Sequence, residues 1–446
     1  MNCRVCDSSS LDLALDLHEQ PWCNNFLRAE EIGTEPYYPL RVVYCHQCHT
    51  PQLDYTVSKE VMFGDHTYLS GVTRTLDAHF KHVASEVDDT FFKCHARKRV
   101  LDIGSNDGTQ LKHYQHLGYD VLGIESSKGT AEIANKAGVE TMAEFVSGNL
   151  LKQLPEKFQV VNAAGVFFHL EDLHDITDGI RSVLDDDGVF VVQFLYMKRI
   201  VENMAFDQIY HEHLLYYNVE TIETLLNLHG LSMFDAYLSP IHGGSIIGYV
   251  GLRGKRGCSQ RLQQLRAEEH RQQSNDFTTY RTFAEEVDRM KTRNREFLSV
   301  VKDQGLTIYG FGAPVKGNTL LNYFDIGPEY VECLVEKNPL RRDLYSPGQY
   351  IRIVMEDELA GPPDMYYVLA WNFKEEILAN NVELIKPKIG IILEVPSVVF
   401  QLKSFVKRVD FISIGTNDLI QYLMAVDRNN LRLKNLYSHF QPAVLK

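Results

Sequence analysis

The sequence has no apolar run long enough to span a bilayer and no apolar signal region near its first residue. We therefore expect a cytoplasmic protein without a membrane anchor. Basic residues are too few to balance the acidic ones, and the net charge of −14 argues against a broad nucleic-acid surface. Cysteine is also scarce, with eight in 446 residues. Without a secretion signal, these cysteines are expected to be reduced or metal-bound and not paired in disulfides.

Four of the cysteines form two CxxC pairs near the start of the chain, Cys3 with Cys6 and Cys45 with Cys48. Each pair puts two thiolates on one tight turn, and two such turns can close a tetrahedral Zn²⁺ site. Free thiols or a redox pair are the alternatives. Because no ligand position is left over, the pattern predicts a structural zinc ion, although His46 or His49 could compete as a ligand.

A nucleotide-binding βα unit is predicted from residue 99 onward. Residues 99–103 form a short apolar run typical of a buried strand, a glycine-containing loop follows, and an amphipathic helical pattern begins at Thr109. A second strand over 120–124 ends in an acidic residue that can accept both ribose hydroxyls. The residues expected to hold the cofactor are Asp102, Gly104, Asn106, Asp107, Gly108 and Glu125.

Two cofactors compete for this unit. A dinucleotide needs three spaced glycines that let its pyrophosphate approach the helix. Here Asn106 and Asp107 occupy the middle of the loop, and acidic Asp102 disfavours phosphate while favouring a cationic amino-acid group. S-adenosylmethionine therefore fits this loop better than NAD.

The cluster from Tyr210 to His213 is the strongest candidate for catalysis, because it joins a phenol, two imidazoles and the Glu212 carboxylate in four positions. Histidine titrates near neutral pH, and a nearby carboxylate can orient it for proton abstraction. A surface turn with a few histidines is the alternative. The cluster follows a predicted strand over 188–194, on the side where parallel sheets bind ligands. Structural roles are expected for His169 and His174.

A second βα unit is predicted near the C-terminus, where a strand over 306–309 precedes a glycine-rich loop that includes Lys316 and Asn318. Such a loop can cradle a diphosphate at a helix start, and a structural turn is the alternative. Between the two units, the polar stretch 255–301 has apolar residues spaced by three and four from Phe277 to Met290, which indicates one face of a long helix.

Several motifs together resemble the S-adenosylmethionine-dependent C-methyltransferases that branch nucleotide-linked deoxysugars. They are the two CxxC pairs, DIGSNDGT at 102–109, AFDQIYHEHLLYY at 205–217, HGGS at 242–245, YGFGAPVKGNTLLNY at 309–323 and AWNFKEEI at 370–377. The resemblance covers roughly residues 1–380. It implies a nucleoside-diphosphate 4-keto-6-deoxyhexose as substrate, methylated at C3 through an enolate.

The resemblance also implies roles for single residues. His213 would be the base, with Tyr210 and Glu212 beside the sugar, and we expect Tyr210 near the keto oxygen and Glu212 to orient or charge an imidazole. His211 is expected to face away. Substrate contacts are expected from His242, Gly243, Gly244, Ser245, Lys316 and Asn318. This chain departs from the family at Ala164–Gly165, where paired asparagines are common, and at Glu336, where Asp is common.

From about residue 388 the sequence instead resembles a late piece of the phosphoenolpyruvate–protein phosphotransferase barrel. Glu394 and Asp418 match Mg²⁺ carboxylates of that family, and Asn417 and Arg428 match its substrate contacts. Because a (β/α)₈ barrel needs eight units, this tail is expected to be an acquired, non-catalytic fragment. Residues 388–393 are expected to replace the last strand of the preceding sheet.

The predicted architecture is α/β, with a small zinc-binding module at 1–70 and a Rossmann-like methyltransferase domain at 71–253. A helical linker at 254–304, a Rossmann-like C-terminal domain at 305–396 and the tail at 397–446 complete it. The leading functional hypothesis is a sugar-nucleotide C-methyltransferase. A non-catalytic fusion product that retains ligand binding and a phosphoenolpyruvate-linked phosphotransferase are the alternatives.

Overall fold

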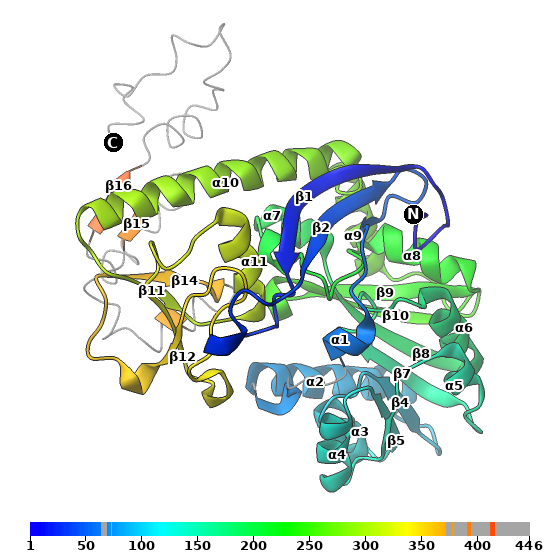
Figure 1. Ribbon diagram of the computed structural model, residues 1–446. Coiled ribbons are helices and arrows are strands. Elements are labelled where there is room, and N and C mark those ends of the chain that lie inside the picture. Colours follow the sequence, from blue (N-terminus) through cyan, green and yellow to red (C-terminus); the bar gives the residue numbers. More distant parts are fainter. Residues whose placement is uncertain (64–68, 73, 372–376, 379–389, 394–410, 415–446) are drawn as a thin grey trace, which may run out of the picture. The chain divides into compact units, whose positions relative to one another are not determined.

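The structure is a computed structural model that describes residues 1–63, 69–72, 74–371, 377–378, 390–393 and 411–414. The chain divides into two compact units (Figure 1). The first comprises residues 1–25, 34–293 and 322–324, and the second comprises 26–33, 294–321 and 325–446. In the part of the chain that the structure describes, no helix is long and apolar enough to cross a membrane.

The first unit begins with an antiparallel sheet of three strands, β1 (Leu11–Pro21), β2 (Tyr37–Cys45) and β3 (Pro51–Leu53). The second CxxC pair forms the turn between β2 and β3, and Leu11 at the start of β1 pairs with Cys45. This pairing brings the first CxxC turn, which precedes β1, to the end of the sheet where the second turn lies.

A seven-stranded sheet forms the centre of the first unit, in the order β6-β5-β4-β7-β8-β10-β9. All pairings are parallel except those of β10, which runs antiparallel to both neighbours. The strands are β4 (Arg99–Ile103), β5 (Asp120–Glu125), β6 (Thr141–Ala143), β7 (Phe158–Ala164), β8 (Leu184–Leu195), β9 (Leu231–Ser239) and β10 (Ser245–Leu252). The order reverses at β4, so the crevice beyond its carboxyl end is where such sheets bind ligands.

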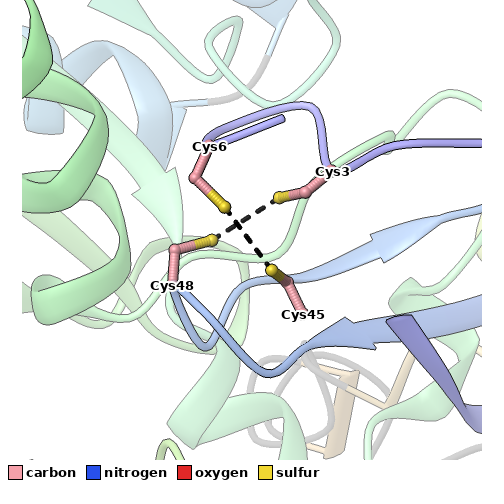
Figure 2. A group of neighbouring side chains, drawn as sticks. All are labelled: Cys3, Cys6, Cys45 and Cys48. Atoms are coloured by element: carbon pink, nitrogen blue, oxygen red, sulfur yellow. Dashed lines mark hydrogen bonds between the residues drawn. The ribbon is translucent and has the colours of Figure 1, made fainter. Parts of the chain in front are cut away.

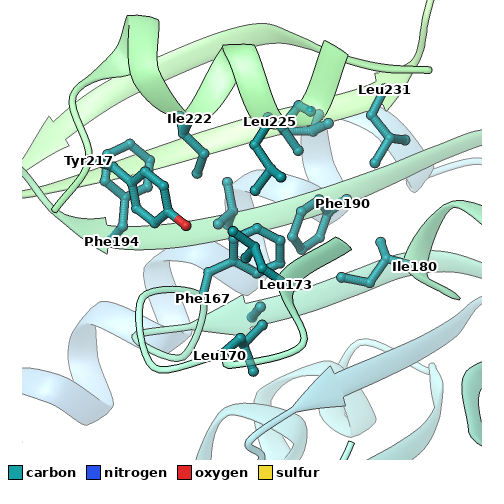
Figure 3. Close-up of a cluster of buried hydrophobic side chains, with 14 of the residues drawn as sticks. Phe167, Leu170, Leu173, Ile180, Phe190, Phe194, Tyr217, Ile222, Leu225 and Leu231 are labelled. Atoms are coloured by element: carbon teal, nitrogen blue, oxygen red, sulfur yellow. The ribbon is translucent and has the colours of Figure 1, made fainter. Parts of the chain in front are cut away.

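The helices that follow the parallel strands bury their apolar faces on this sheet. They are α3 (Thr109–His116), α4 (Lys128–Lys136), α5 (Gly148–Lys152), α6 (Leu173–Val183) and α8 (Val219–Leu228). Figure 3 shows one such layer, where Ile180, Ile222 and Leu225 pack near Phe190 of β8. Each of these four side chains is fully buried, so their burial is a main source of the stability of this layer.

The second unit contains a four-stranded parallel sheet in the order β13-β12-β11-β14. Its elements are β11 (Ile308–Phe311), α11 (Val315–Phe324), β12 (Cys333–Glu336), β13 (Ile353–Met355) and β14 (Met365–Val368). The predicted βα unit is therefore present. A Rossmann-like α/β architecture is confirmed for the chain.

The long helix predicted from the spacing of Phe277 to Met290 is α10 (Phe277–Asp303), and a second helix, α9 (Gln260–Arg271), precedes it. The chain turns between them because Gln273 adopts a positive φ of 53° and the Ser274 N–H bonds to the carbonyl of Glu269. The residues of this turn are polar, and neither glycine nor proline marks it in the sequence.

The prediction that residues 388–393 complete the sheet of the second unit was wrong, as β15 (Gly390–Leu393) shows. This strand pairs in parallel with β16 (Phe411–Ile414), in a separate two-stranded sheet, and does not extend the β13-β12-β11-β14 sheet. Two apolar tail segments therefore satisfy each other's backbone hydrogen bonds. The tail residues Glu394, Asp418, Asn417 and Arg428 lie outside the described residues.

Candidate active site and metal centre

The four cysteines Cys3, Cys6, Cys45 and Cys48 converge on one point (Figure 2). All four Sγ atoms lie within 4.8 Å of one another, with Cys3 to Cys48 at 3.5 Å and Cys6 to Cys45 at 3.6 Å. A tetrahedral Zn²⁺ with bonds of about 2.3 Å needs sulfur atoms about 3.8 Å apart, so the four thiols fit this ion closely.

Nitrogen donors around the sulfurs support the same assignment. The backbone N–H of Val5 and the Gln52 amide both donate to the Cys3 Sγ, at 3.4 and 3.1 Å. Such donors stabilise the thiolate form that binds metal. His46 bonds to Asp12 and His49 bonds to Tyr44, so both histidines have partners other than a metal.

The predicted cofactor loop joins β4 to α3 and has a strained, compact backbone. Gly104, Asn106 and Gly108 all have positive φ, at 70°, 50° and 77°. A Cβ on Gly104 would lie 2.4 Å from the Val166 side chain, so only glycine fits there. The loop therefore brings its backbone close to the crevice beyond β4, as a bound ligand requires.

Two acidic residues of the predicted set flank this loop. The Glu125 carboxylate, at the end of β5, accepts from the backbone N–H groups of Asn106 at 3.0 Å and Ser127 at 2.8 Å. A carboxylate offers about four acceptor positions, so it can still receive ribose hydroxyls. Asp102 is 2% exposed, and burial, followed by the charge of Glu125, raises its pKa well above the usual range. A cationic group nearby would restore its charge, as the methionyl ammonium of S-adenosylmethionine could do.

A short segment that the sequence did not single out covers this loop. The backbone N–H groups of Ser70 and Gly71 donate to the side chains of Asn106 and Asp107, both at 2.8 Å. A cavity of about 460 Å³ lies beside it, lined by Gly71, Asp77, Asp107, Thr109, Lys112, His113 and His116. The Asn106 and Asp107 side chains thus hold a neighbouring segment, a use that no local sequence pattern reveals.

His213 lies in the segment after β8 and is only 5% exposed. Its Nδ1 is 2.8 Å from the carbonyl oxygen of Gln208, which can only accept a hydrogen bond. Nδ1 therefore carries the proton. Burial, followed by the nearby His169, lowers the pKa of His213 well below its usual range, so the imidazole is neutral and its Nε2 can accept a proton.

Aromatic rings fix the plane of His213. The Tyr210 ring lies 3.9 Å from its centroid and the Phe168 ring 4.6 Å away. The His169 ring, at 5.1 Å, donates from Nδ1 to the carbonyl of Glu212. His242, 29 residues further along the chain, also lowers the pKa of His213 and so lies near it. Three histidines that are separate in the sequence therefore share one site.

The expectation that Glu212 orients an imidazole needs correction, because its carboxylate accepts from the Trp22 indole N–H at 2.9 Å. Burial raises the pKa of Glu212 to about 7, against the hydrogen bonds from Trp22 and Asn24 that lower it. The carbonyl of Gln208 orients His213 instead. His211 bonds to the carbonyl of Tyr38, and burial lowers its pKa to about 4.

The predicted substrate-binding residues fall in both units. In the first, His242 has a φ of 57° and Gly244 a φ of 127°, and the buried Ser245 hydroxyl donates to the carbonyl of Ile241 at 3.0 Å. Gly243 accepts from Asn203. In the second unit, Lys316 lies over the Trp371 ring at 4.2 Å, near the start of α11, and Asn318 is 1% exposed. His174 belongs to a pair with His229, with nitrogens 2.7 Å apart.

Family models match consecutive parts of the chain. A putative zinc-binding domain matches residues 3–63, a methyltransferase domain 76–235 and a C-methyltransferase C-terminal domain 240–396. A PEP-binding domain of PEP-utilising enzymes matches 368–446. These matches and the central sheet define the class of the protein as a methyltransferase with an N-terminal zinc-binding domain.

A curated relative makes the class more specific. C-methyltransferase NovU of Streptomyces niveus is 28% identical over 400 residues, which cover 88% of this chain and 95% of the relative. The magnesium protoporphyrin IX methyltransferase of Synechocystis PCC 6803, solved with bound SAM, has a TM-score of 0.31 and 15% identity over 43% of this chain and 88% of its own. The resemblance stated from the motifs is confirmed: over most of its length the chain is similar to a C-methyltransferase, and S-adenosylmethionine and a structural zinc ion are the cofactors that these matches support.

The tail has relatives of another kind. A phosphoenolpyruvate-dependent phosphotransferase system protein of Escherichia coli (strain K12) is 62% identical over 64 residues, 14% of this chain. These residues span only 9% of the length of that relative. The resemblance of the tail to a fragment of that protein is confirmed.

Proposed function

We propose that the chain transfers a methyl group from S-adenosylmethionine to C3 of a nucleoside-diphosphate 4-keto-6-deoxyhexose, with His213 as base. The observation that carries this proposal is the state of the His213 ring. It is buried, neutral and held as the Nδ1–H tautomer by the Gln208 carbonyl. A neutral imidazole whose Nε2 carries no proton suits the removal of a proton beside a ketone.

The proposed reaction needs few groups from the protein. His213 Nε2 takes the C3 proton, and the electrons of that C–H bond form an enolate with the 4-keto group. The bound cofactor supplies an electrophilic methyl group. C3 forms the new bond to this methyl while the sulfur–methyl bond breaks, which leaves S-adenosylhomocysteine, and His213 then releases the proton to solvent. The Tyr210 hydroxyl is proposed to donate to the keto oxygen, where charge develops.

Separate groups are proposed to contact the sugar and the diphosphate. In the first unit, Glu212 and the segment from His242 to Ser245 would contact the sugar. In the second, Lys316 and Asn318 at the start of α11 would contact the diphosphate, because a helix start and a lysine favour an anion. The relative NovU is named as a C-methyltransferase, which supports carbon as the acceptor atom.

The decisive experiment is methyl transfer to a panel of 4-keto sugar nucleotides, read by mass spectrometry, with His213→Asn beside His229→Asn as the matched histidine control. The His229 side chain is also largely buried, at 9% exposed, and it bonds to Asp178 and His174. We expect His213→Asn to lose at least 100-fold in turnover and His229→Asn to match the parent. Turnover by His213→Asn at the parental rate would overturn the assignment of the base.

A second measurement separates the base from the methylated position. Without cofactor, the parent should exchange the C3 hydrogen for deuterium from solvent, and His213→Asn should not. C5 is also adjacent to the ketone, so NMR of the product must place the new methyl group. A product methylated at C5 would contradict the C3 assignment while leaving the base unchanged.

A further inference from the structure

We propose that Gln52 is a positioning residue that couples the four-cysteine centre to the segment that carries His213. The side chain of Gln52 is fully buried, and both polar atoms of its amide contact the first CxxC turn. Its Nε2 donates to the Cys3 Sγ at 3.1 Å, and its Oε1 accepts from the Arg4 N–H at 2.8 Å. The amide thus holds the first CxxC turn against β3.

The backbone around Gln52 contacts the catalytic segment directly. Gln52 forms an antiparallel bridge with Leu215, two residues after His213. The Leu53 N–H donates to the carbonyl of Leu214 at 2.9 Å, and the Tyr216 N–H donates to the carbonyl of Pro51 at 3.0 Å. Residues 214–216 therefore act as an added strand beside β3.

The added strand also forms a hydrogen bond to the loop whose side chains surround His213. The Leu214 N–H donates at 2.8 Å to the carbonyl of Phe168, whose ring packs on His213. Residues 214–216 thus lie between β3 and the loop that carries Phe168 and His169. A shift of β3 would move the His213 ring relative to its neighbours, and displacements near 1 Å cost catalysis heavily.

In this arrangement, a zinc ion would stabilise the position of residues 214–216. Four thiolates on one ion fix the two CxxC turns, the Gln52 amide fixes β3 to the first turn, and β3 fixes residues 214–216. The metal centre is too closed for chemistry, because all four positions are filled by sulfur. It supports catalysis by keeping the segment of the base in one place, as hydrogen-bonded neighbours of metal sites commonly do.

The test compares Gln52→Met with Gln20→Met in the full-length, zinc-loaded protein. Methionine keeps the length of the side chain and removes the amide. Gln20 is a buried glutamine of the same sheet, and its amide donates to the carbonyl of Leu17 in its own strand. We expect Gln52→Met to lower kcat by roughly 10- to 100-fold with S-adenosylmethionine affinity unchanged. Gln20→Met should keep the kcat and the S-adenosylmethionine affinity of the parent.

Hydrogen–deuterium exchange supplies a readout that does not depend on activity. The amides of residues 214–216 should lose protection in Gln52→Met, while those of β4, β7 and β8 keep theirs. Zinc release by a chelator from the parent protein should produce the same local loss. The activity arm rests on the proposed role of His213, whereas the exchange arm does not.

Two outcomes would overturn the coupling. One is unchanged exchange at 214–216 in both Gln52→Met and the chelated parent. The other is loss of protection throughout the central sheet together with loss of cofactor affinity, which would mean that the metal centre supports the whole fold and not this segment. If Gln52→Met fails to fold, the chelated parent alone decides between these results.

Discussion

At the scale of single residues, the burial of the Glu212 carboxyl destabilises the folded protein at neutral pH. The carboxyl is 6% exposed and its pKa is raised to about 7, mainly by burial. The unfolded chain would hold this proton only below its usual pKa of 4.5. Between these two values the folded protein binds more protons, so its free energy of unfolding falls as pH rises.

Replacement by glutamine removes this cost while keeping the shape of the side chain. As pH rises, we expect Glu212→Gln to become more stable relative to the parent. The difference between their free energies of unfolding should reach about 3 kcal/mol above pH 7. Denaturant unfolding at about pH 4 and pH 8 measures it. A difference that stays constant with pH would show that Glu212 ionises as freely in the folded protein as in the unfolded chain.

Residue identities alone indicated the chemistry of this site but not its contacts. Tyr210, Glu212 and His213 are close in the sequence, and the Tyr210 and His213 rings also lie 3.9 Å apart in the structure. The Trp22–Glu212 hydrogen bond joins residues 190 positions apart, so no local pattern could predict it. The expected imidazole partner of Glu212 was wrong for that reason, because the nearest residues in sequence do not define the nearest in space.

At the scale of elements, the turn between β4 and α3 depends on Gly104. A side chain there would clash with Val166 and would have to adopt a positive φ. We expect Gly104→Ala to weaken S-adenosylmethionine binding at least tenfold and to lower the melting temperature, because relief of the clash must move the cofactor loop. Calorimetric titration and thermal unfolding measure the two effects.

Gly118 provides the matched control at the other end of α3. It also has a positive φ, at 83°, but a Cβ there would meet nothing within 4 Å. Gly118→Ala should therefore cost about 1 kcal/mol of backbone strain and leave cofactor affinity unchanged. Equal affinity in both variants would contradict the assignment of the Gly104 loop to the cofactor.

Element predictions succeeded where a local pattern determines the structure. The apolar runs at β4 and β8 and the glycines of the cofactor loop needed no distant partner to be recognised. They did not identify the turn at Gln273, where a polar residue adopts a positive φ, and they were wrong at β15, whose apolar pattern is compatible with any sheet edge. The sequence pattern of a strand predicts that it pairs with another strand, but it does not identify that other strand.

At the scale of the whole molecule, the groups assigned to the cofactor and to the base belong to the first compact unit. The Gly104 loop, Glu125, His213 and the four cysteines all lie within residues 1–25 and 34–293. The match to the PEP-binding domain lies at 368–446, in the other unit. The match to the C-methyltransferase C-terminal domain also extends into this unit, to residue 396, but the groups assigned to the cofactor and to the base lie outside it.

This separation leads to a prediction about the tail. A chain that ends at residue 396 should bind S-adenosylmethionine with the affinity of the full chain, since none of the cofactor-binding groups is removed. Calorimetric titration of both chains checks this. The full chain should release no pyruvate from phosphoenolpyruvate, because a fragment that spans 9% of its relative lacks the other units of a closed barrel. Pyruvate formation by the full chain, lost in the shortened one, would show instead that the tail is an active part of the protein.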